Sequence, residues 1–311
     1  MLAVAQAGGP EADVLSFVPP RIRVPLQTMA AVSPPWLEVR LAAGRPVCVR
    51  TVSGDLWPDA SGRAGDPGAA VHCDREDIER CVQIVTRASV YAWEEELARG
   101  FCTLPGGHRV GLVGRVRWQD RTVAGQKEFG SINLRVARPV PGCADAVLSH
   151  VLHGGSVCST IVFGPPGSGK TTLIRELARH LSLGPPGLRV AVADERSEIG
   201  ACVAGMPQFD LGPRTDVLDG CPKHVALPML VRSMAPDVVF CDELGGAEDA
   251  AALAETARCG VAVVATAHAR SMSELWTRPS LRDAVRSGSF GLGIGLGTDR
   301  RIGFVGALRP L

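Results

Sequence analysis

The feature of this sequence that most constrains its fold is the run Gly-Pro-Pro-Gly-Ser-Gly-Lys-Thr at residues 164–171. The apolar residues 160–163 before it are typical of a buried strand, and residues 172–179 after it are typical of a helix. A strand, a Gly-rich turn and a helix are the context that a phosphate-binding loop requires. An ordinary Gly-rich turn would not need Lys170 and Thr171 in register. We therefore predict a P-loop (Walker A) segment here.

The chemistry of this run predicts a nucleoside triphosphate as its ligand. The glycines let the backbone curl so that its N–H groups face inward, and the helix dipole adds positive potential at the same point. Lys170 supplies a charge for the β- and γ-phosphates, and the Thr171 hydroxyl is a ligand for Mg²⁺. ATP is the default nucleotide for this class. The predicted binding residues are Gly164, Pro165, Pro166, Gly167, Ser168, Gly169, Lys170, Thr171 and Thr172.

Length and composition leave room for two domains and predict an intracellular chain. A chain of 311 residues can bury two cores, and a net charge of +1 provides no global field that would favour nucleic acid or an acidic membrane. The 10 cysteines are scattered without a Cys-x-x-Cys pair, which favours small buried hydrophobes in a reducing cytosol over disulfides or zinc. With no signal-peptide pattern and no run of ~20 apolar residues, we expect a soluble chain with peripheral membrane contact at most.

Sequence patterns divide the chain into a leader and two domains. Residues 1–35 are rich in Pro, Ala and Gly, which predicts a flexible leader. Residues 36–140 predict a smaller N-terminal α+β domain that ends in the Pro-rich segment 139–142, and residues 141–311 predict a second domain. The elements expected in the first domain are strands at 37–41 and 46–52, a helix from Asp74 to Leu97, a hairpin over 101–117 with His108 at its polar tip, and a strand over 131–137.

From about residue 143 the pattern is that of an α/β protein. Apolar strands alternate with helical stretches, as in a parallel sheet with crossover helices. In such sheets, ligands bind beyond the carboxyl ends of the strands, and here every predicted strand is followed by polar or glycine residues. The predicted strands cover residues 159–163, 188–193, 237–241 and 261–265.

Acidic residues at two of these strand ends are candidate catalytic groups. Asp242 would hold the Mg²⁺ shell, and Glu243 would polarise the attacking water; the alternative is a simple strand-end turn. After another strand, one carboxylate of Asp194 and Glu195 would position water or Mg²⁺ and the other would pair with Arg196. Glu195 is weakly favoured for the first role. A solvated charged turn at a helix start is the alternative there.

Other polar residues complete the list of candidates. Thr266 and His268 end the strand after the Asp-Glu pair, where a polar side chain can respond to the presence of the γ-phosphate. The alternative for His268 is a histidine satisfied by the backbone. Cationic side chains from a neighbouring subunit can also stabilise phosphoryl charge. The candidates for that role are Arg135, Arg138, Arg214, Lys223 and Arg232.

Several long motifs resemble the stage III sporulation protein AA family. In the second half these are Val-Ala-Asp-Glu-Arg-Ser-Glu-Ile, Arg-Thr-Asp-Val-Leu-Asp-Gly-Cys-Pro-Lys and Arg-Ser-Met-Ala-Pro-Asp. The first half contributes Ser-Val-Tyr-Ala-Trp-Glu-Glu-Glu-Leu, Leu-Pro-Gly-Gly-His-Arg-Val-Gly and Asn-Leu-Arg-Val-Ala-Arg. The resemblance covers roughly residues 36–270. The leader and the Gly-rich segment 286–297 do not match the family pattern.

The resemblance implies a RecA-like P-loop ATPase core similar to the ATPases of type II and type IV secretion and of pilus retraction. It implies an ATP hydrolase that uses Mg²⁺ and assembles into a ring, a hexamer in the family pattern. It also implies a place on the mother-cell side of the membrane around the forespore, where the ring would energise a channel of membrane proteins. Lys170 and Thr171 would bind phosphate and magnesium, Asp242 and Glu243 would form the catalytic strand end, and Glu195 would lie in the acidic box. His268 falls where secretion ATPases carry a histidine motif.

Two other functions fit parts of the sequence. RecA-like cores also occur in nucleic-acid motors, but the neutral net charge and the 1 Tyr, 8 Phe and 5 Trp residues provide no basic-aromatic platform for bases. We therefore expect no nucleic-acid partner. A scaffold that binds ATP to assemble, with little turnover, is the second alternative, although an intact Asp242-Glu243 pair disfavours it.

Overall fold

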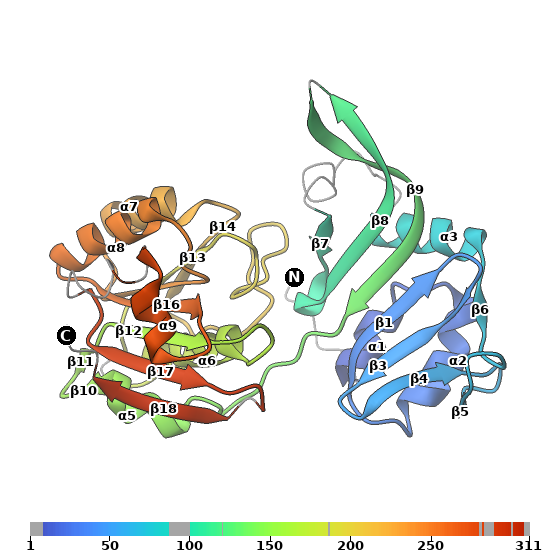
Figure 1. Cartoon of the computed structure of the whole chain (residues 1–311), viewed down its shortest axis with the longest axis horizontal. Coiled ribbons are helices and arrows are strands. Elements are labelled where there is room, and N and C mark those ends of the chain that lie inside the picture. Colours follow the sequence, from blue (N-terminus) through green and yellow to red (C-terminus); the bar gives the residue numbers. More distant parts are fainter. Residues whose placement is uncertain are drawn as a thin grey trace. The chain divides into compact units, whose positions relative to one another are not determined.

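The computed structural model describes residues 9–86, 100–119, 121–185, 187–279, 282, 289–299 and 301–307 (Figure 1). The chain divides into two compact units, residues 1–138 and 139–311. The division falls at the start of the Pro-rich segment 139–142. Each unit has its own core and is described by itself.

The first unit is built on a seven-stranded antiparallel sheet in the order β5-β4-β3-β1-β9-β8-β7. A second, two-stranded pair joins β2 (Arg45–Pro46) to β6 (His72–Cys73). The predicted hairpin over 101–117 is present as β7 and β8, and β8 continues into a longer hairpin with β9. The strands of the large sheet are β1 (Trp36–Ala42), β3 (Cys48–Thr51), β4 (Gly54–Pro58), β5 (Ala64–Gly65), β7 (Phe101–Thr103), β8 (Arg109–Gln119) and β9 (Thr122–Arg135).

Helix α3 (Arg75–Val85) begins where the capping pattern predicts. The Asp74 carboxylate accepts the N–H of Asp77 at 2.8 Å, and the Asp77 carboxylate accepts the N–H of Asp74 at 2.9 Å. Its apolar face buries Ile78 and Cys81 in the core. The predicted continuation to Leu97 lies in residues 87–99, outside the described residues.

The predicted flexible leader is wrong for residues 9–30. This segment forms α1 (Gly9–Leu15) and α2 (Pro20–Ala30), which belong to the core of the first unit. Pro20 suits the first turn of a helix, where its missing N–H costs nothing. The side chains that are at most 1% exposed follow helical spacing, which the Pro- and Ala-rich composition obscured. They are Val14, Leu15, Val18, Ile22, Leu26 and Met29.

The prediction that places His108 at a polar hairpin tip is wrong, because its side chain is buried. It follows the short 3₁₀ segment η2 (Pro105–Gly107) and is 1% exposed. Its Nδ1 accepts the N–H of Ala137 at 3.0 Å, and its Nε2 lies 4.0 Å from Oδ2 of Asp13 in α1. The chain that leaves the sheet after β9 is therefore tied to the interior of this unit by a buried imidazole.

Burial of this imidazole predicts an acid-sensitive first unit. Desolvation holds the pKa of His108 below 6.5, with partial opposition from Asp13, so the unfolded chain takes up the proton first as the pH falls. Stability should be full above about pH 6.5 and should decrease below it. His108→Asn keeps an acceptor for Ala137 but does not titrate. The thermal midpoint of the first unit should be measured at about pH 7.5 and at about pH 5.5 for both proteins. The drop in midpoint between the two pH values should be smaller in the variant than in the parent; an equal drop would contradict the prediction.

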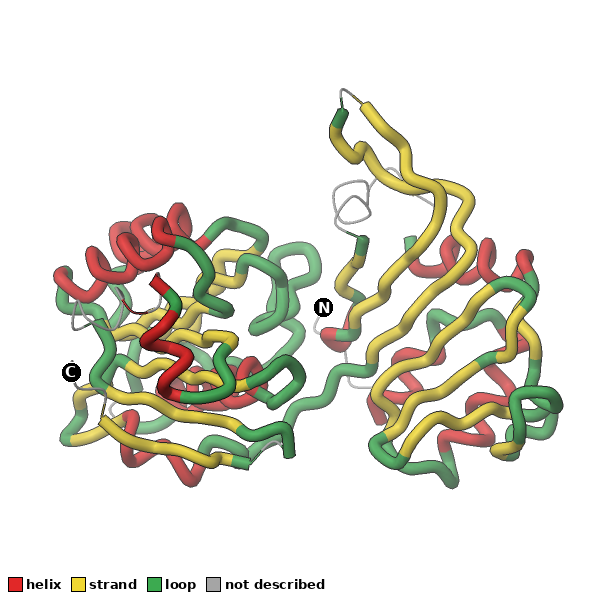
Figure 2. The backbone as a smooth tube through the Cα atoms, viewed as in Figure 1, coloured by secondary structure: helices red, strands yellow, loops and turns green. Residues whose placement is uncertain are grey.

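The second unit has the predicted α/β architecture, with both helices and strands (Figure 2). Its sheet has the strand order β14-β13-β15-β16-β12-β17-β18. The first six strands are parallel, and β18 pairs antiparallel to β17. A small hairpin joins β10 (Leu152–His153) and β11 (Ser156–Val157). The sheet strands are β12 (Thr160–Gly164), β13 (Val190–Asp194), β14 (Thr215–Asp219), β15 (Val238–Cys241), β16 (Ala262–His268), β17 (Leu292–Leu296) and β18 (Ile302–Ala307).

Helices cover both faces of this sheet. Along β15, Val238 and Phe240 enter the core under α5 and α6, whereas Val239 and Cys241 enter the core under α7, α8 and α9. Parallel strands buried on both faces need continuous apolar sequence, which β12, β13 and β15 have, whereas the edge strand β14 is partly exposed. No helix among the described residues is long and apolar enough to cross a membrane. The helices are α5 (Asp145–Val151), α6 (Lys170–Leu183), α7 (Lys223–Met234), α8 (Ala247–Arg258) and α9 (Met272–Thr277).

The Gly-rich segment near the C-terminus, for which the family motifs offered no match, contributes β17, which lies between β12 and the edge strand β18. Strand β17 pairs in parallel with β12, the strand that leads into the Gly-rich loop. A Cβ on Gly164 would meet the carbonyl oxygen of Leu296 at 2.8 Å, so the two strand ends approach closely. Residues 286–288 lie outside the described part of the chain.

Candidate functional site

The loop between β12 and α6 has the backbone of an anion-binding turn. Gly167 and Gly169 have φ of 74° and 94°, in the left-handed region that favours glycine. Helix α6 begins at Lys170 with no side-chain cap and no acidic residue in its first turn, so its N-terminal N–H groups are available to a ligand. Thr171 and Thr172 lie in that first turn. The Ser168 hydroxyl is buried and has no hydrogen-bond partner among the described residues.

Lys170 holds its ammonium group within this loop. Its Nζ lies 3.0 Å from the carbonyl oxygens of Gly164 and Pro165 and 3.0 Å from Nδ1 of His268. Burial lowers the pKa of Lys170, with Glu243 opposing the shift. Every proton of this ammonium therefore has an internal partner that a phosphate oxygen could replace.

His268 links Lys170 to Glu243, in the acidic pair that follows β15. Its Nε2 lies 3.2 Å from Oε1 of Glu243, and Oε2 of Glu243 accepts from Arg196 at 3.2 Å. The structure thus places Lys170, His268, Glu243 and Arg196 in one connected chain of polar contacts. A cavity of about 550 Å³ opens beside it, lined by Pro165, Pro166, Glu243, His268, Ala269, Arg270, Glu274 and Arg278. Its volume is in the range of small-molecule sites.

Asp242 and Glu195 form a second cluster around a buried lysine. Asp242 follows β15 and is 2% exposed, and its Oδ1 accepts from Lys223 Nζ at 3.1 Å. Lys223 also donates to the Glu195 carboxylate. Burial raises the pKa of Asp242 to about 6, although Lys223 opposes the shift. Its second oxygen, Oδ2, is buried without a hydrogen-bond partner among the described residues.

The structure separates the two residues of the other acidic strand end. Asp194 is fully buried and accepts the backbone N–H groups of Glu198, Ile199 and Gly200 at 2.8, 3.0 and 2.8 Å. From α6, Arg175 donates to the carbonyl oxygens of Ile199 and Glu198 at 2.8 and 2.7 Å. Asp194 therefore shapes the backbone of the following loop, whereas Glu195 faces Lys223.

Three of the other cationic candidates have partners elsewhere. Arg214 donates to the carbonyl oxygen of Ser182 at 2.9 Å, and Arg232 donates to that of Pro228 at 3.1 Å. In the first unit, Arg138 pairs with the Glu11 carboxylate. We had considered Lys223 only as a group donated to a neighbouring subunit. In sequence, Lys223 is a cation at a helix start, after a proline and before an apolar run. That position was the one local sign that its side chain is buried.

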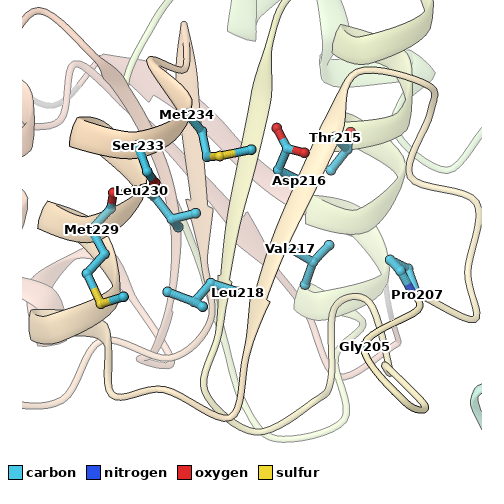
Figure 3. A pocket seen from close by; sticks show the side chains of 10 residues that line it. All are labelled: Gly205, Pro207, Thr215, Asp216, Val217, Leu218, Met229, Leu230, Ser233 and Met234. Atoms are coloured by element: carbon cyan, nitrogen blue, oxygen red, sulfur yellow. Dashed lines mark hydrogen bonds between the residues drawn. The ribbon is translucent and has the colours of Figure 1, made fainter.

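A second cavity, of about 390 Å³, shares no lining residue with either cluster. Figure 3 shows its walls, with Met229 and Met234 of α7 on one side and Thr215 and Val217 of β14 on the other. Asp216 is the acidic group among the lining residues. Among the described residues, no three or more His, Cys, Asp or Glu side chains are grouped as a metal site.

Comparison with known sequences agrees with the motifs. A family model described as sporulation stage III, protein AA, matches residues 12–308. Stage III sporulation protein AA of Bacillus subtilis is 41% identical over 253 residues, which are 79% of this chain and 78% of that protein. Protein SEEDLING PLASTID DEVELOPMENT 1 of Arabidopsis thaliana is 35% identical over 153 residues, 49% of this chain and 22% of that protein.

Solved structures with a similar fold include an ATPase and a pilus retraction motor. The Legionella pneumophila ATPase DotB has a TM-score of 0.54 and 14% identity, covering 89% of this chain and 77% of its own. The pilus retraction motor PilT, solved with bound ADP, has a TM-score of 0.57 and 17% identity, covering 88% of this chain and 77% of its own. At such low identity the comparison shows a shared fold, which agrees with the α/β class expected from the sequence.

Proposed function

Because the chain belongs to the stage III sporulation protein AA family, we propose that it binds ATP and hydrolyses it to drive a sporulation-associated secretion or channel apparatus. The observation that carries this proposal is the contact chain from Lys170 through His268 to Glu243 at one edge of the parallel sheet. It joins a phosphate-binding group to a carboxylate that can act on water. The shared fold with DotB and PilT supports a motor ATPase.

In this proposal the loop residues 164–172 bind the phosphates. Lys170 exchanges its carbonyl partners for phosphate oxygens, and the first-turn N–H groups of α6 bind the same anion. Thr171 and Asp242 would hold Mg²⁺, and the unpartnered buried Oδ2 of Asp242 fits that role. Mg²⁺, when bound, would neutralise charge that develops on the phosphates.

Glu243 is the proposed group that polarises the attacking water. It lies between the imidazole of His268 and the guanidinium of Arg196, which fix its orientation. Because His268 contacts both Lys170 and Glu243, arrival of phosphate at Lys170 would free the imidazole and alter the surroundings of Glu243. Glu195 would contribute through the acidic cluster around Lys223.

We further propose that the chain works as a homo-oligomeric ring, taken as hexameric from the family resemblance. A neighbouring subunit would supply an arginine to the phosphoryl group. Partners would be membrane proteins of the sporulation channel, on the mother-cell side of the membrane around the forespore. No nucleic-acid partner is part of the proposal. Family membership and the secretion-ATPase fold support these assignments.

The test is ATP turnover measured against protein concentration, with Glu243→Gln as the matched blank. Turnover per chain should rise with concentration, because a neighbour completes the site. It should fall by about a hundredfold in Glu243→Gln, while nucleotide binding is retained. Clear ATP binding with negligible, mutant-insensitive turnover would instead support the nucleotide-gated scaffold. Turnover stimulated by single or double strands in a salt-dependent way would support a nucleic-acid motor.

A further inference from the structure

Lys223 occupies a position that is unfavourable for a cation in three respects. It is 4% exposed, so its ammonium has lost most of its hydration. It is the first residue of α7, where the helix dipole already provides positive potential. The first turn of α7 contains no acidic residue that would offset this. Favourable contacts elsewhere must therefore hold the charge in place.

Those contacts are the two carboxylates beyond the ends of β13 and β15, which are adjacent strands. Lys223 Nζ lies 3.1 Å from Oδ1 of Asp242 and also donates to the Glu195 carboxylate. Both carboxylates are within hydrogen-bonding reach of the ammonium, so they offset the cost of its burial. Lys223 is thus a charged ammonium that binds the same pair of carboxylates that a divalent cation would find at this edge of the sheet.

We propose that Lys223 is an internal cation that holds Asp242 and Glu195 together in the nucleotide-free protein and excludes free divalent cations from them. Mg²⁺ then enters only together with the phosphates of the nucleotide. The proposal rests on the proposed function in one respect, the assignment of Asp242 to the Mg²⁺ shell. Lys223 acts through Asp242 and Glu195, so it is a positioning residue.

The charges of the cluster explain the exclusion. Two carboxylates and one ammonium leave a single net negative charge, and a divalent cation would also meet repulsion from the ammonium at short range. Mg²⁺ gives up its water reluctantly and is usually bound by one or two carboxylates together with substrate phosphates. Phosphates bound in the loop would supply the missing negative charge. The buried Oδ2 of Asp242 has no partner among the described residues, so it can accept from the metal shell while Oδ1 stays with Lys223.

The experiment is a titration of the full-length chain with Mn²⁺ in the absence of nucleotide. Binding is measured as the loss of the EPR signal of the free ion. The parent and Lys223→Arg, which keeps the charge, should bind no stoichiometric Mn²⁺. Lys223→Met has similar length without the charge and should gain one site per chain, at least about tenfold tighter than any binding by the parent. Adding Asp242→Asn to Lys223→Met should abolish that site.

Three results would overturn the proposal. The first is tight, stoichiometric Mn²⁺ binding by the nucleotide-free parent. This measurement does not depend on the folding of any variant. The second is binding by Lys223→Arg as tight as that by Lys223→Met, since charge would then not be the cause. The third is a folded Lys223→Met that gains no site. None of these readouts depends on turnover, so a parent that fails to hydrolyse ATP would contradict the proposed function alone.

Discussion

Lys170→Ala is expected to lower ATP turnover by roughly a hundred- to a thousandfold, or ~3 kcal/mol of transition-state stabilisation. Lys170 supplies the buried positive charge at the phosphate-binding loop, and its ammonium is already directed at the carbonyl oxygens of Gly164 and Pro165. Alanine leaves the backbone N–H groups in place but removes that charge from the phosphoryl group. Turnover at saturating ATP and at low ATP should be measured for the parent and the variant.

Lys127→Ala is the matched control for this loss. Lys127 is an exposed lysine on β9 of the first unit, and its side chain pairs only weakly, at 3.9 Å, with Glu128. Its removal should leave turnover within about twofold of the parent, because an exposed ion pair contributes little. Near-parental turnover in Lys170→Ala, with its thermal midpoint unchanged, would show that the loop is not the hydrolytic site.

Asp194→Ala is expected to destabilise the second unit by about 3 kcal/mol. The Asp194 carboxylate accepts three backbone N–H groups, and an unsatisfied buried donor costs about 1–3 kcal/mol. Relief from burying a charge offsets part of that loss, since desolvation raises the pKa of Asp194. For a unit of this size, the midpoint of its thermal transition should fall by roughly 6–12 °C.

Asp216→Ala is the matched control for stability. Asp216 lies on the neighbouring strand β14, directly opposite Ala191 of β13, and its side chain is exposed. Its replacement should change the unfolding free energy by no more than about 0.5 kcal/mol. Calorimetry on both variants separates the two cases. Equal, small shifts would mean that the loop after β13 does not depend on Asp194 and that Asp194 is available for chemistry.

Local sequence was sufficient for the Gly-rich loop between β12 and α6 and for four of the parallel strands, β12, β13, β15 and β16, but it did not indicate β14 or β17. The loop needs glycines where φ is positive and a lysine at the helix start, and these requirements involve adjacent residues. The buried parallel strands are short apolar runs, and they can be recognised without knowledge of their neighbours. Ligands bind at the carboxyl ends of such strands. This rule identified as candidates Asp242, Glu243, Glu195 and His268.

Composition misled the interpretation of the first 35 residues. Proline and alanine there are typical of a mobile segment, but α1 and α2 place apolar side chains at helical spacing against the sheet. Whether such a segment is ordered depends on a surface that can receive its apolar face. That surface includes strands much later in the chain, such as β8 and β9. The same kind of long-range packing buries His108, which looks like a polar turn residue in sequence.

The sequence by itself determined the class of fold, the Gly-rich turn between β12 and α6 and the family, because each depends on patterns within short stretches of chain. Only the tertiary structure decided which charged groups share an environment. Lys223 and Glu195 are 28 residues apart, and Lys170 and His268 are 98 residues apart. Burial makes their pairing necessary, since a desolvated charge must have a partner. The order of the strands determines which charged residue becomes the partner. No single stretch of sequence specifies that order.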